Sequence, residues 1–386
     1  MRLRPALLVG LVVAHVLSGL VHWALWRWLR SIAPEWTSRH RRPLVATIAA
    51  LVLVPVGREI AFFWPGSSFW PLVGAFGLLS NLVVWFGMAC VGVLRLVGRF
   101  FRRSAPRVAE RREALERIGG AIAFAASGTV LGWGTLRGRF EWAVEEVPIR
   151  LSRLPRALDG FTIVQISDLH VGTFLGEREL DRGLGLVDRI RSDLIVVTGD
   201  IVDSDPRFVP LAARRLGALR AREGIVCIPG NHDYYTGAST VLEGMRRAGI
   251  DVLLNRGKII AEPDGGLALL GVDDLWSRDR RRGGGPDLDR ARSSVRPDLA
   301  TVLLAHQPRF ASVASAAGID LQLSGHTHGG QINPGFRPID FFYQYVAGRY
   351  DVGPMQLYVN RGFGTVGPPT RVGAPPEITK IVLVAG

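Results

Sequence analysis

Five short polar blocks between residues 168 and 328 carry side chains that bind metal ions. Their carboxylate, imidazole and carboxamide groups suit borderline and hard divalent metals, whereas a thiolate site would need cysteine. One Asp-x-His pair alone means little, but five such blocks in one chain predict a metal centre that several segments build together. The blocks are Asp168-Leu169-His170, Gly199-Asp200-Ile201-Val202-Asp203, Gly230-Asn231-His232-Asp233, His306 and Gly325-His326-Thr327-His328.

Most of these blocks follow a short apolar run. A continuous run of this length, bounded by turn residues, predicts a strand that is buried on both faces of a sheet. Side chains that follow neighbouring strands then meet at one edge of the sheet. The runs are Phe161–Ile166, Leu194–Val197, Ile225–Ile228, Val302–Leu304 and Leu321–Leu323.

Helical segments alternate with these strands, which predicts an α/β layered domain. Glycine opens three of the polar blocks, where it permits a tight turn and a close approach of the backbone to the metals. The expected helices are Leu180–Arg191, Val209–Arg222 and Val241–Ala248.

Together the blocks resemble the pattern of the calcineurin-like metallophosphoesterase superfamily: DxH, GDxxD, GNH(D/E), H and GHxH. The resemblance extends from about Ala157 to the C-terminus. It implies a metal-dependent phosphoric ester hydrolase with two packed β-sheets flanked by helices. The segments Gly325–Gln331 and Gly362-Phe363-Gly364…Pro375-Pro376-Glu377 resemble a membrane-associated bacterial branch. That branch includes envelope-lipid phosphoesterases and UDP-2,3-diacylglucosamine pyrophosphatases.

The resemblance also implies two divalent metal ions, with Mn, Zn and Fe all open. Two ions about 3.5–4 Å apart need a carboxylate that bridges them, and Asp200 is the candidate. A neutral asparagine ligand keeps the site cationic enough to attract phosphate. By this resemblance one ion is bound by Asp168, His170, Asp200 and His328, and the other by Asp200, Asn231, His306 and His326.

Two further residues of the third block are implied to be catalytic. His232 stabilises charge on phosphoryl oxygens and protonates the leaving group after attack by a metal-activated hydroxide. Asp233 is expected to hydrogen-bond that imidazole and orient it. Asp203 is expected only in a supporting role. No metal role is assigned to His15, His22 or His40.

The first part of the chain is too apolar for an ordinary soluble domain. The 386 residues are 48% hydrophobic, and the mean hydropathy is +0.20. Four apolar stretches approach the ~20 residues that cross a bilayer, although each could instead be a buried core helix, the Gly-rich fourth most of all. A cleaved signal peptide fits poorly. The stretches are Ala6–Leu29, Leu44–Phe63, Leu72–Leu94 and Ile118–Leu136.

We therefore expect a membrane region over residues 1–136 with about four transmembrane helices, a linker over 137–156 and the catalytic domain over 157–386. Residues 1–142 carry 18 Lys and Arg against 6 Asp and Glu, whereas the rest carries 29 against 28. The apolar part thus holds +12 of the net charge of +13, which argues against nucleic acid as the partner. Nine of the ten Trp also lie there, as in interfacial belts.

Arginine counting predicts the topology. The segment Arg95–Arg117, between the third and fourth stretches, holds eight Arg, and a second basic segment follows the first stretch. Both should face the cytoplasm by the positive-inside rule. Four spans then place the catalytic domain outside the cytoplasm at a bacterial inner (plasma) membrane. If Ile118–Leu136 does not span, the domain is cytoplasmic.

The expected substrate is a phosphoester or pyrophosphate, held at the membrane as part of a lipid. The aromatic segment Pro338–Tyr350 either contacts acyl chains or packs in the core. One alternative is a UDP-2,3-diacylglucosamine pyrophosphatase-like hydrolase that faces the cytoplasm. Others are a non-catalytic membrane sensor or scaffold and a transporter-like protein. The residues leave the exact substrate and the oligomeric state open.

Overall fold

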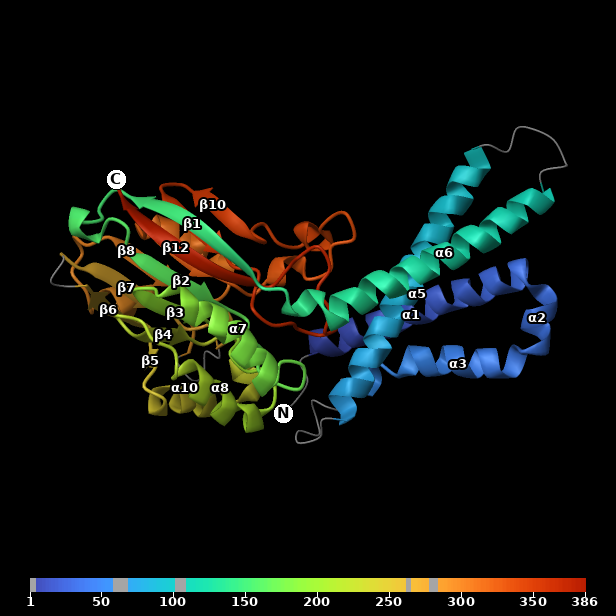
Figure 1. Ribbon diagram of the computed structural model, residues 1–386, viewed down its shortest axis with the longest axis horizontal. Coiled ribbons are helices and arrows are strands. Elements are labelled where there is room, and N and C mark those ends of the chain that lie inside the picture. Colours follow the sequence, from blue (N-terminus) through green and yellow to red (C-terminus); the bar gives the residue numbers. More distant parts are fainter. Residues whose placement is uncertain (1–4, 58–68, 101–108, 262–264, 278–283) are drawn as a thin grey trace. The chain divides into compact units, whose positions relative to one another are not determined.

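The structure is a computed structural model that describes residues 5–57, 69–100, 109–261, 265–277 and 284–386 (Figure 1). The chain divides into two compact units, Met1–Trp133 and Gly134–Gly386. The first is helical, and the second is an α/β unit with two sheets. The expected fold class, apolar N-terminal helices followed by an α/β domain, is confirmed.

The described part of the first unit consists of long apolar helices and one short connecting helix. Figure 1 shows α1 and α3 running side by side in opposite directions, joined by α2. The end of the second apolar stretch, after residue 57, lies outside the described residues. The helices are α1 (Pro5–Ile32), α2 (Pro34–Arg39), α3 (Arg41–Leu53), α5 (Phe69–Phe100) and α6 (Ala109–Leu136).

Among the described residues, two helices are long and apolar enough to cross a membrane by length and composition. These are Phe69–Gly98, within α5, and Ala114–Phe140, which begins in α6. The second contains the Gly-rich stretch whose ability to span decided the expected topology.

Small residues let the helices of this unit approach each other closely. Trp28 of α1 stacks on Phe124 of α6 with ring centroids 5.6 Å apart. A Cβ at Gly120 would overlap the Trp28 ring, and one at Gly87 of α5 would lie 2.7 Å from Phe124. Glycine therefore sets how near α1, α5 and α6 come to one another, as in other packed apolar helices.

The first sheet of the second unit has the order β1-β12-β2-β3-β4-β5. Strands β2 to β5 are parallel, and β12 is antiparallel to β2 but parallel to β1. Parallel strands buried on both faces account for the continuous apolar runs of β2, β3 and β4. The strands are β1 (Ala143–Leu151), β2 (Thr162–Ile166), β3 (Leu194–Thr198), β4 (Ile225–Ile228), β5 (Asp251–Val252) and β12 (Glu377–Ala385).

The second sheet has the order β10-β11-β9-β8-β7-β6. Its four inner strands are parallel, and β6 and β10 pair antiparallel at the edges. The strands are β6 (Arg256–Ile260), β7 (Leu267–Gly271), β8 (Thr301–Leu304), β9 (Leu321–Ser324), β10 (Gly348–Val352) and β11 (Met355–Val359).

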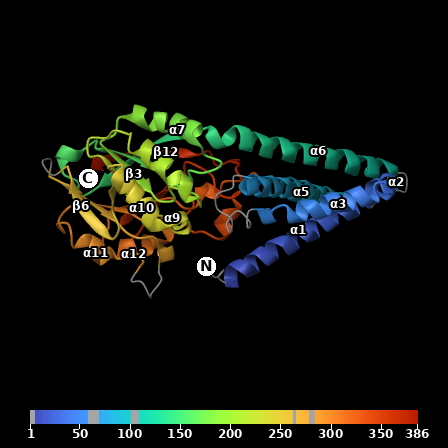
Figure 2. The ribbon, with the colours of Figure 1, turned by 90° about the horizontal axis from the view of Figure 1, so that it is seen from below.

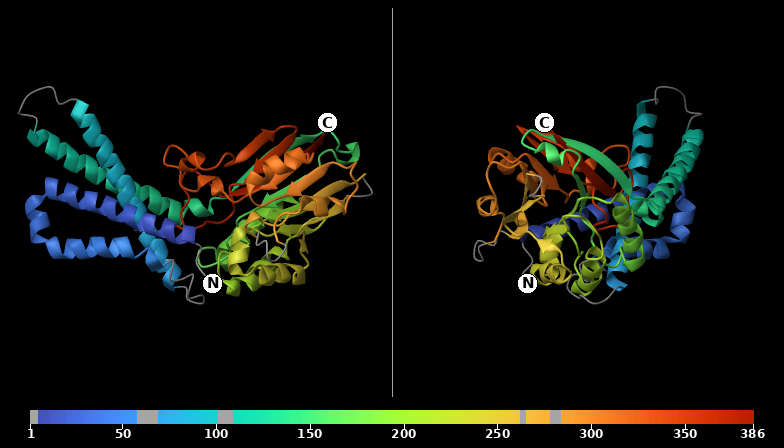
Figure 3. Two further views of the ribbon diagram at one scale, coloured as in Figure 1. Left: turned by 180° about the vertical axis from the view of Figure 1, so that it is seen from behind. Right: turned by 60° about the vertical axis from the view of Figure 1, so that its left-hand side comes forward.

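Three apolar clusters separate four layers. One lies between the first sheet and α7, α8 and α10, one between the two sheets, and one between the second sheet and α11 and α12. Figures 2 and 3 show the two helical layers on opposite sides of the sheets. The helices are α7 (Glu177–Ile190), α8 (Val209–Leu216), α9 (Asn231–Thr236), α10 (Ala238–Arg247), α11 (Leu288–Arg292) and α12 (Ala311–Ala316).

The helices α7 and α10 lie close to their expected positions, but α8 is shorter than predicted. It ends at Leu216, and Gly217 follows as its C-cap. A Cβ at Gly217 would lie 2.6 Å from the carbonyl oxygen of Ala248, so the chain turns where it contacts the end of α10. This contact between segments distant in sequence gives no local signal.

The structure differs from the expected linker over residues 137–156. Strand β1 occupies Ala143–Leu151 and pairs along its whole length with β12. It is an edge strand with Glu146 and Pro148 on its exposed face and Glu145 half-buried on the other face. Proline and charge are tolerated at a sheet edge but weaken the sequence pattern of a strand.

Candidate metal centre

The ligand-type residues follow the carboxyl ends of strands in both sheets. Asp168 and His170 follow β2, Asp200 follows β3, and Asn231 begins α9 after β4. His306 follows β8, and His326 and His328 follow β9. Because β2, β3 and β4 are parallel neighbours, as are β8 and β9, these ends share one edge of the two-sheet sandwich.

Asp168, His170 and His328 form a first group whose donor atoms all lie within 4.8 Å of one another. The Nε2 atoms of His170 and His328 are 3.1 Å apart. Nε2 of His328 lies 3.5 Å from Oδ1 of Asp168. Nε2 of His170 also lies 3.7 Å from Oδ2 of Asp200.

Asp200, His306 and His326 form a second such group. Nε2 of His306 lies 3.3 Å from Oδ2 of Asp200 and 3.2 Å from Oδ1 of Asn231. Nδ1 of His326 lies 3.3 Å from Nε2 of His306. A third group joins His170 and Asp200 to His232. The structure thus brings together all seven residues expected as ligands, and Asp200 borders both of their clusters.

Backbone conformation at these residues is strained. Asp168, His170, Asp200, His326 and His328 have φ angles of 51°, 49°, 52°, 75° and 52°. They make up five of the nine described non-glycine residues with positive φ. Such residues are uncommon and cluster at functional sites, where the surrounding structure holds the strain.

Two glycines give the ligands room. A Cβ at Gly230 would overlap the carboxylate of Asp200, and one at Gly325 would overlap Ser167 and the carboxylate of Asp168. Any larger residue would therefore displace a carboxylate from the cluster, so these blocks need glycine for space.

Burial and neighbouring charges favour the metal-binding forms of His328, His326 and Asp200. Burial is the largest cause that holds the pKa of His328 well below its ordinary value, and the charge of Arg371 is the next. Burial, followed by the charge of His306, lowers the pKa of His326 to about 3. Burial opposes ionisation of Asp200, but the charges of His306, His232 and His170 together outweigh burial and keep the pKa of that carboxyl low. Neutral imidazoles and an ionised carboxylate are the forms that bind metal, so the donor set fits divalent cations.

His306 and Asp168 are exceptions, and for Asp168 the cause is burial, which raises the pKa of its carboxyl. Burial lowers the pKa of His306, but the charges of Asp200, Asp168 and Asp274 together outweigh burial and raise that pKa well above the ordinary value. A proton on this imidazole therefore competes with a cation. The ring is oriented by a hydrogen bond between Nδ1 and the carbonyl oxygen of Thr198, at 2.8 Å, which leaves Nε2 facing the cluster.

Arg371 contacts the ligand His328 and was not predicted from the sequence. Its guanidinium is buried and donates to the carbonyl oxygens of His328, Arg361, Gly362 and Gly364. It also lies 3.1 Å from Nδ1 of His328. The positive charge disfavours protonation of that ring and so preserves a metal-binding imidazole.

The orienting partner of His232 is Asp203 rather than Asp233, which corrects the expectation. Nδ1 of His232 lies 2.9 Å from the carbonyl oxygen of Asp203 and 3.2 Å from its Oδ1. Asp203 also lies 3.4 Å from Nδ1 of His170. One carboxylate therefore contacts both imidazoles.

Asp233 instead closes the turn that begins α9. Its carboxylate accepts hydrogen bonds from the backbone N–H groups of Gly230, Ile201 and Val202, at 2.8, 3.0 and 3.2 Å. The residue is three positions after the N-cap, where an acidic side chain folds back as in a capping box. The Gly230-x-x-Asp233 spacing is the sequence signal that would have found this role.

Aromatic side chains border the cluster on two sides. The Tyr235 ring lies 4.9 Å from that of His232 and 5.2 Å from that of Trp276, by ring centroids. On the other side, the Tyr343 hydroxyl lies 3.5 Å from Nε2 of His326.

The aromatic segment Pro338–Tyr350 has a packed part and an exposed part. Tyr345 and Tyr350 pack in the cluster beneath the second sheet. Phe341 and Phe342 are 82% and 83% exposed.

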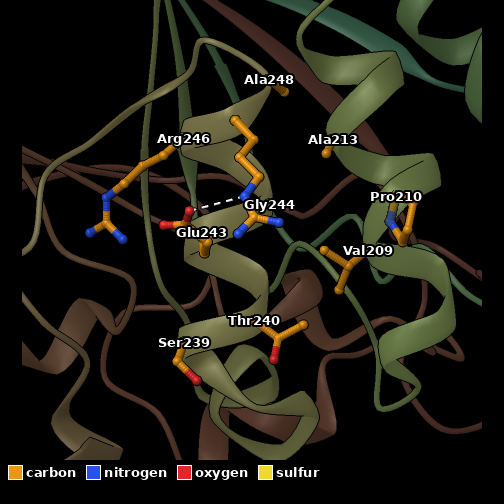
Figure 4. Close-up of a pocket in the computed structure, with 10 residues that line it drawn as sticks. Val209, Pro210, Ala213, Ser239, Thr240, Glu243, Gly244, Arg246 and Ala248 are labelled. Carbon is orange, nitrogen blue, oxygen red and sulfur yellow. Dashed lines mark hydrogen bonds and ion pairs between the residues drawn. The ribbon is translucent and has the colours of Figure 1, made fainter.

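The pocket in Figure 4 lies between α8 and α10, away from this chemistry. Glu243 and Arg247 form an ion pair of 3.0 Å at its wall. The metal-ligand candidates are absent from its lining, which consists of Val209, Pro210, Ala213, Ser239, Thr240, Glu243, Gly244, Arg246, Arg247 and Ala248.

Comparisons with known proteins agree with this site. Residues 161–330 match the family described as calcineurin-like phosphoesterase. YkuE of Bacillus subtilis, an uncharacterised metallophosphoesterase, is 34% identical over 287 residues, which are 71% of this chain and 97% of that protein.

Two vertebrate relatives are each named a transmembrane protein with metallophosphoesterase domain. The Danio rerio protein is 31% identical over 91% of this chain and 82% of its own length. The Bos taurus protein is 35% identical over 63% of this chain, and the match spans 57% of that protein.

The relatives are named metallophosphoesterases, and the structure contains side-chain clusters that could bind metal. Both findings support a metal-dependent phosphoesterase activity for this chain. The residues matched to the family run from the start of β2 through the last ligand block. The chain belongs to the calcineurin-like phosphoesterase family.

Proposed function

We propose that this chain is a membrane-anchored phosphoesterase that uses two divalent metal ions to hydrolyse phosphoester or pyrophosphate bonds of lipid-linked substrates. The observation that carries the proposal is the position of Asp200. Its Oδ2 lies 3.7 Å from Nε2 of His170 and 3.3 Å from Nε2 of His306, so one carboxylate can serve both ligand groups.

In this proposal Asp168, His170, Asp200 and His328 hold one ion and Asp200, Asn231, His306 and His326 hold the other. When bound, such a pair supplies Lewis-acid activation of water and neutralises phosphoryl charge. His232 supplies the proton for the leaving oxygen. Burial lowers the pKa of His232, but Asp200 and Asp203 outweigh it and raise it to about 9. Asp203 holds Nδ1, which leaves Nε2 for the substrate.

Metal analysis of the purified full chain tests the site. Removal of metal with a chelator should abolish turnover, and separate readdition of Mn, Zn and Fe should restore it with two ions per chain. A fully active protein with one ion per chain would contradict the bridging role of Asp200.

The short connection between the last candidate span and the catalytic unit supports a lipid-linked substrate. Two residues, Glu141 and Trp142, separate the end of the candidate span Ala114–Phe140 from the start of β1 at Ala143. The last turn of α6 is part of the second unit, because Gly134 accepts a hydrogen bond from the backbone N–H of Arg371 at 3.2 Å. The short connection after the candidate span limits how far the metal site can lie from the bilayer.

The test of this substrate class is turnover on a lipid phosphoester compared with its soluble headgroup analogue. The proposal expects higher kcat/KM on the lipid. Equal efficiency on both would leave the membrane anchor as localisation only.

We further propose a bacterial inner-membrane protein with a membrane region over residues 1–136, about four spans and an extracytoplasmic catalytic unit. The basic segment Arg95–Arg117 precedes the final span, so the catalytic unit faces the other side of the membrane. This holds whatever the number of earlier spans. A UDP-2,3-diacylglucosamine pyrophosphatase-like hydrolase facing the cytoplasm would require α6 not to cross.

A further inference from the structure

An exposed aromatic loop follows the last ligand block. Residues 334–343, here called the aromatic loop, include Phe336, Phe341 and Phe342, which are 59%, 82% and 83% exposed. No other described large apolar side chain in the molecule is as exposed as the last two. Exposed apolar patches of this kind mark interaction surfaces, because each ring left in water forgoes the gain of burial.

The aromatic loop is held in one shape. Asn333, at its base, donates through its amide to the carbonyl oxygens of Gly329 and Gly373 at 3.0 and 3.2 Å. The backbone N–H of Phe342 bonds the carbonyl oxygen of Ile339 at 2.9 Å. The two phenyl rings therefore project from a built turn.

The base of the loop lies on the segment that also contacts the last helix. The backbone N–H of Asn333 donates to the carbonyl oxygen of Val372 at 2.7 Å, and Ile332 forms a bridge with Val372. The preceding residue, Arg371, donates to Gly134 at the end of α6. Within the catalytic unit, the aromatic loop thus emerges beside the end of the candidate span Ala114–Phe140.

The other end of the loop reaches the metal centre. Tyr343 lies with its hydroxyl 3.5 Å from Nε2 of His326, and the two ring centroids are 5.9 Å apart. The exposed rings and the ligand cluster are therefore connected by one residue of the same turn.

We propose that the aromatic loop inserts into the lipid–water interface of the membrane that anchors the chain. Continuity with the end of the span identifies the bilayer as the occupant of this surface. The charges of the loop, Arg337 and Asp340, pair at 3.1 Å, so insertion depends on the phenyl rings and needs no anionic lipid. The inference rests on the proposed lipid substrate for its purpose, since a seated loop presents membrane-borne phosphoesters to the centre.

Insertion is measured directly with an environment-sensitive NBD label. The full chain with Cys90→Ser and Phe342→Cys is labelled and reconstituted in phosphatidylcholine vesicles that contain doxyl lipids. Cys227 is buried and escapes labelling. The control label replaces Asp298, which is 72% exposed at the amino end of β8, the opposite edge from the ligands. The proposal expects quenching at position 342 well above that at 298.

A second measurement links the loop to turnover. Phe341→Ser with Phe342→Ser should lower turnover of a lipid phosphoester in vesicles about tenfold, because two interfacial rings are lost. Hydrolysis of a soluble phosphoester should stay within about twofold, since neither ring contacts the ligands. Val313→Ser, at a residue that is 49% exposed on α12, is the matched control and should change neither rate.

The outcomes separate this inference from the proposed function. Equal quenching at positions 342 and 298 would overturn insertion. Loss of lipid turnover without quenching would also overturn it and would make the rings a contact for the substrate's acyl chain. Strong quenching with equal hydrolysis of lipid and soluble esters would support insertion and contradict only the lipid substrate.

Discussion

Asp200 is the residue on which the candidate centre depends most. Its carboxylate borders both ligand groups and accepts a hydrogen bond from the backbone N–H of His232 at 2.7 Å. Asp200→Asn should therefore lower metal content and reduce kcat by more than the roughly 10–100-fold that residues outside the ligand set cost. Metal analysis and steady-state kinetics check this. Asp181→Asn, on the exposed face of α7, should leave both unchanged.

His232 and Asp203 are expected to act together. His232→Ala should keep both metals and lower kcat, with the largest losses on substrates whose leaving groups are poor. Asp203→Asn should reproduce part of this effect, about 10–100-fold, because the imidazole loses its orienting carboxylate. A series of aryl phosphoesters with graded leaving groups measures the dependence. Equal losses across the series would remove His232 from proton transfer.

Asp233 should behave differently, because its contacts are with the backbone. The two carboxylate oxygens of Asp233 together accept from three N–H groups, and Asp233→Asn replaces one of these oxygens by an amide donor. One or more buried N–H groups then lose their acceptor, at a cost of about 1–3 kcal/mol each. Thermal unfolding should detect this loss of stability. An unchanged Tm with a leaving-group-dependent loss of rate would restore the catalytic role first expected of Asp233.

Sequence reasoning works well for the ligand blocks and poorly for their supports. The blocks combine rare residue types with buried strand ends, so their meeting point could be predicted. Arg371 is one of 47 Lys and Arg, and its contact with His328 arises only when the chain folds back across the site. Tyr343 reaches His326 in the same way. Such long-range contacts leave no local pattern.

At the scale of elements, α7 offers a matched test of packing. Gly183 faces Phe363, whose ring a Cβ would overlap, whereas nothing lies within 4 Å of a Cβ at Gly185. Gly183→Ala should destabilise the catalytic unit by about 1–3 kcal/mol through overpacking. Gly185→Ala should stabilise it by about 0.5–1 kcal/mol, because alanine is the better helix former. Chemical denaturation of the two variants compares them, and effects of the same sign would contradict the packing.

Strands with two buried faces were predictable because they read as continuous apolar runs. Strand β1 was not predicted because it is buried on one face alone. Glu145, Glu146 and Pro148 obscure the alternation of apolar and polar residues that such a strand would show. Pairing with β12, more than 220 positions later, is what makes this segment a strand.

At the scale of the whole molecule, the proposed topology has a direct test. A reporter that is active only in the cytoplasm, fused after Gly386, should give no signal, whereas fusion within the basic segment Arg95–Arg117 should give a strong one. The reason is that one candidate span, Ala114–Phe140, lies between these positions among the residues that the structure describes. Activity at both sites would mean that α6 does not cross, and it would favour the cytoplasmic alternative.

The backbone and the side chain of Arg371 both form hydrogen bonds, and these contacts decide where the chain can be truncated. Its backbone holds Gly134 at the end of α6, and its guanidinium contacts His328. The last residues of α6 therefore belong to the catalytic unit. A soluble form cut at residue 157 would lose β1 and the helix end, and one that begins at Gly134 is the shortest that keeps both.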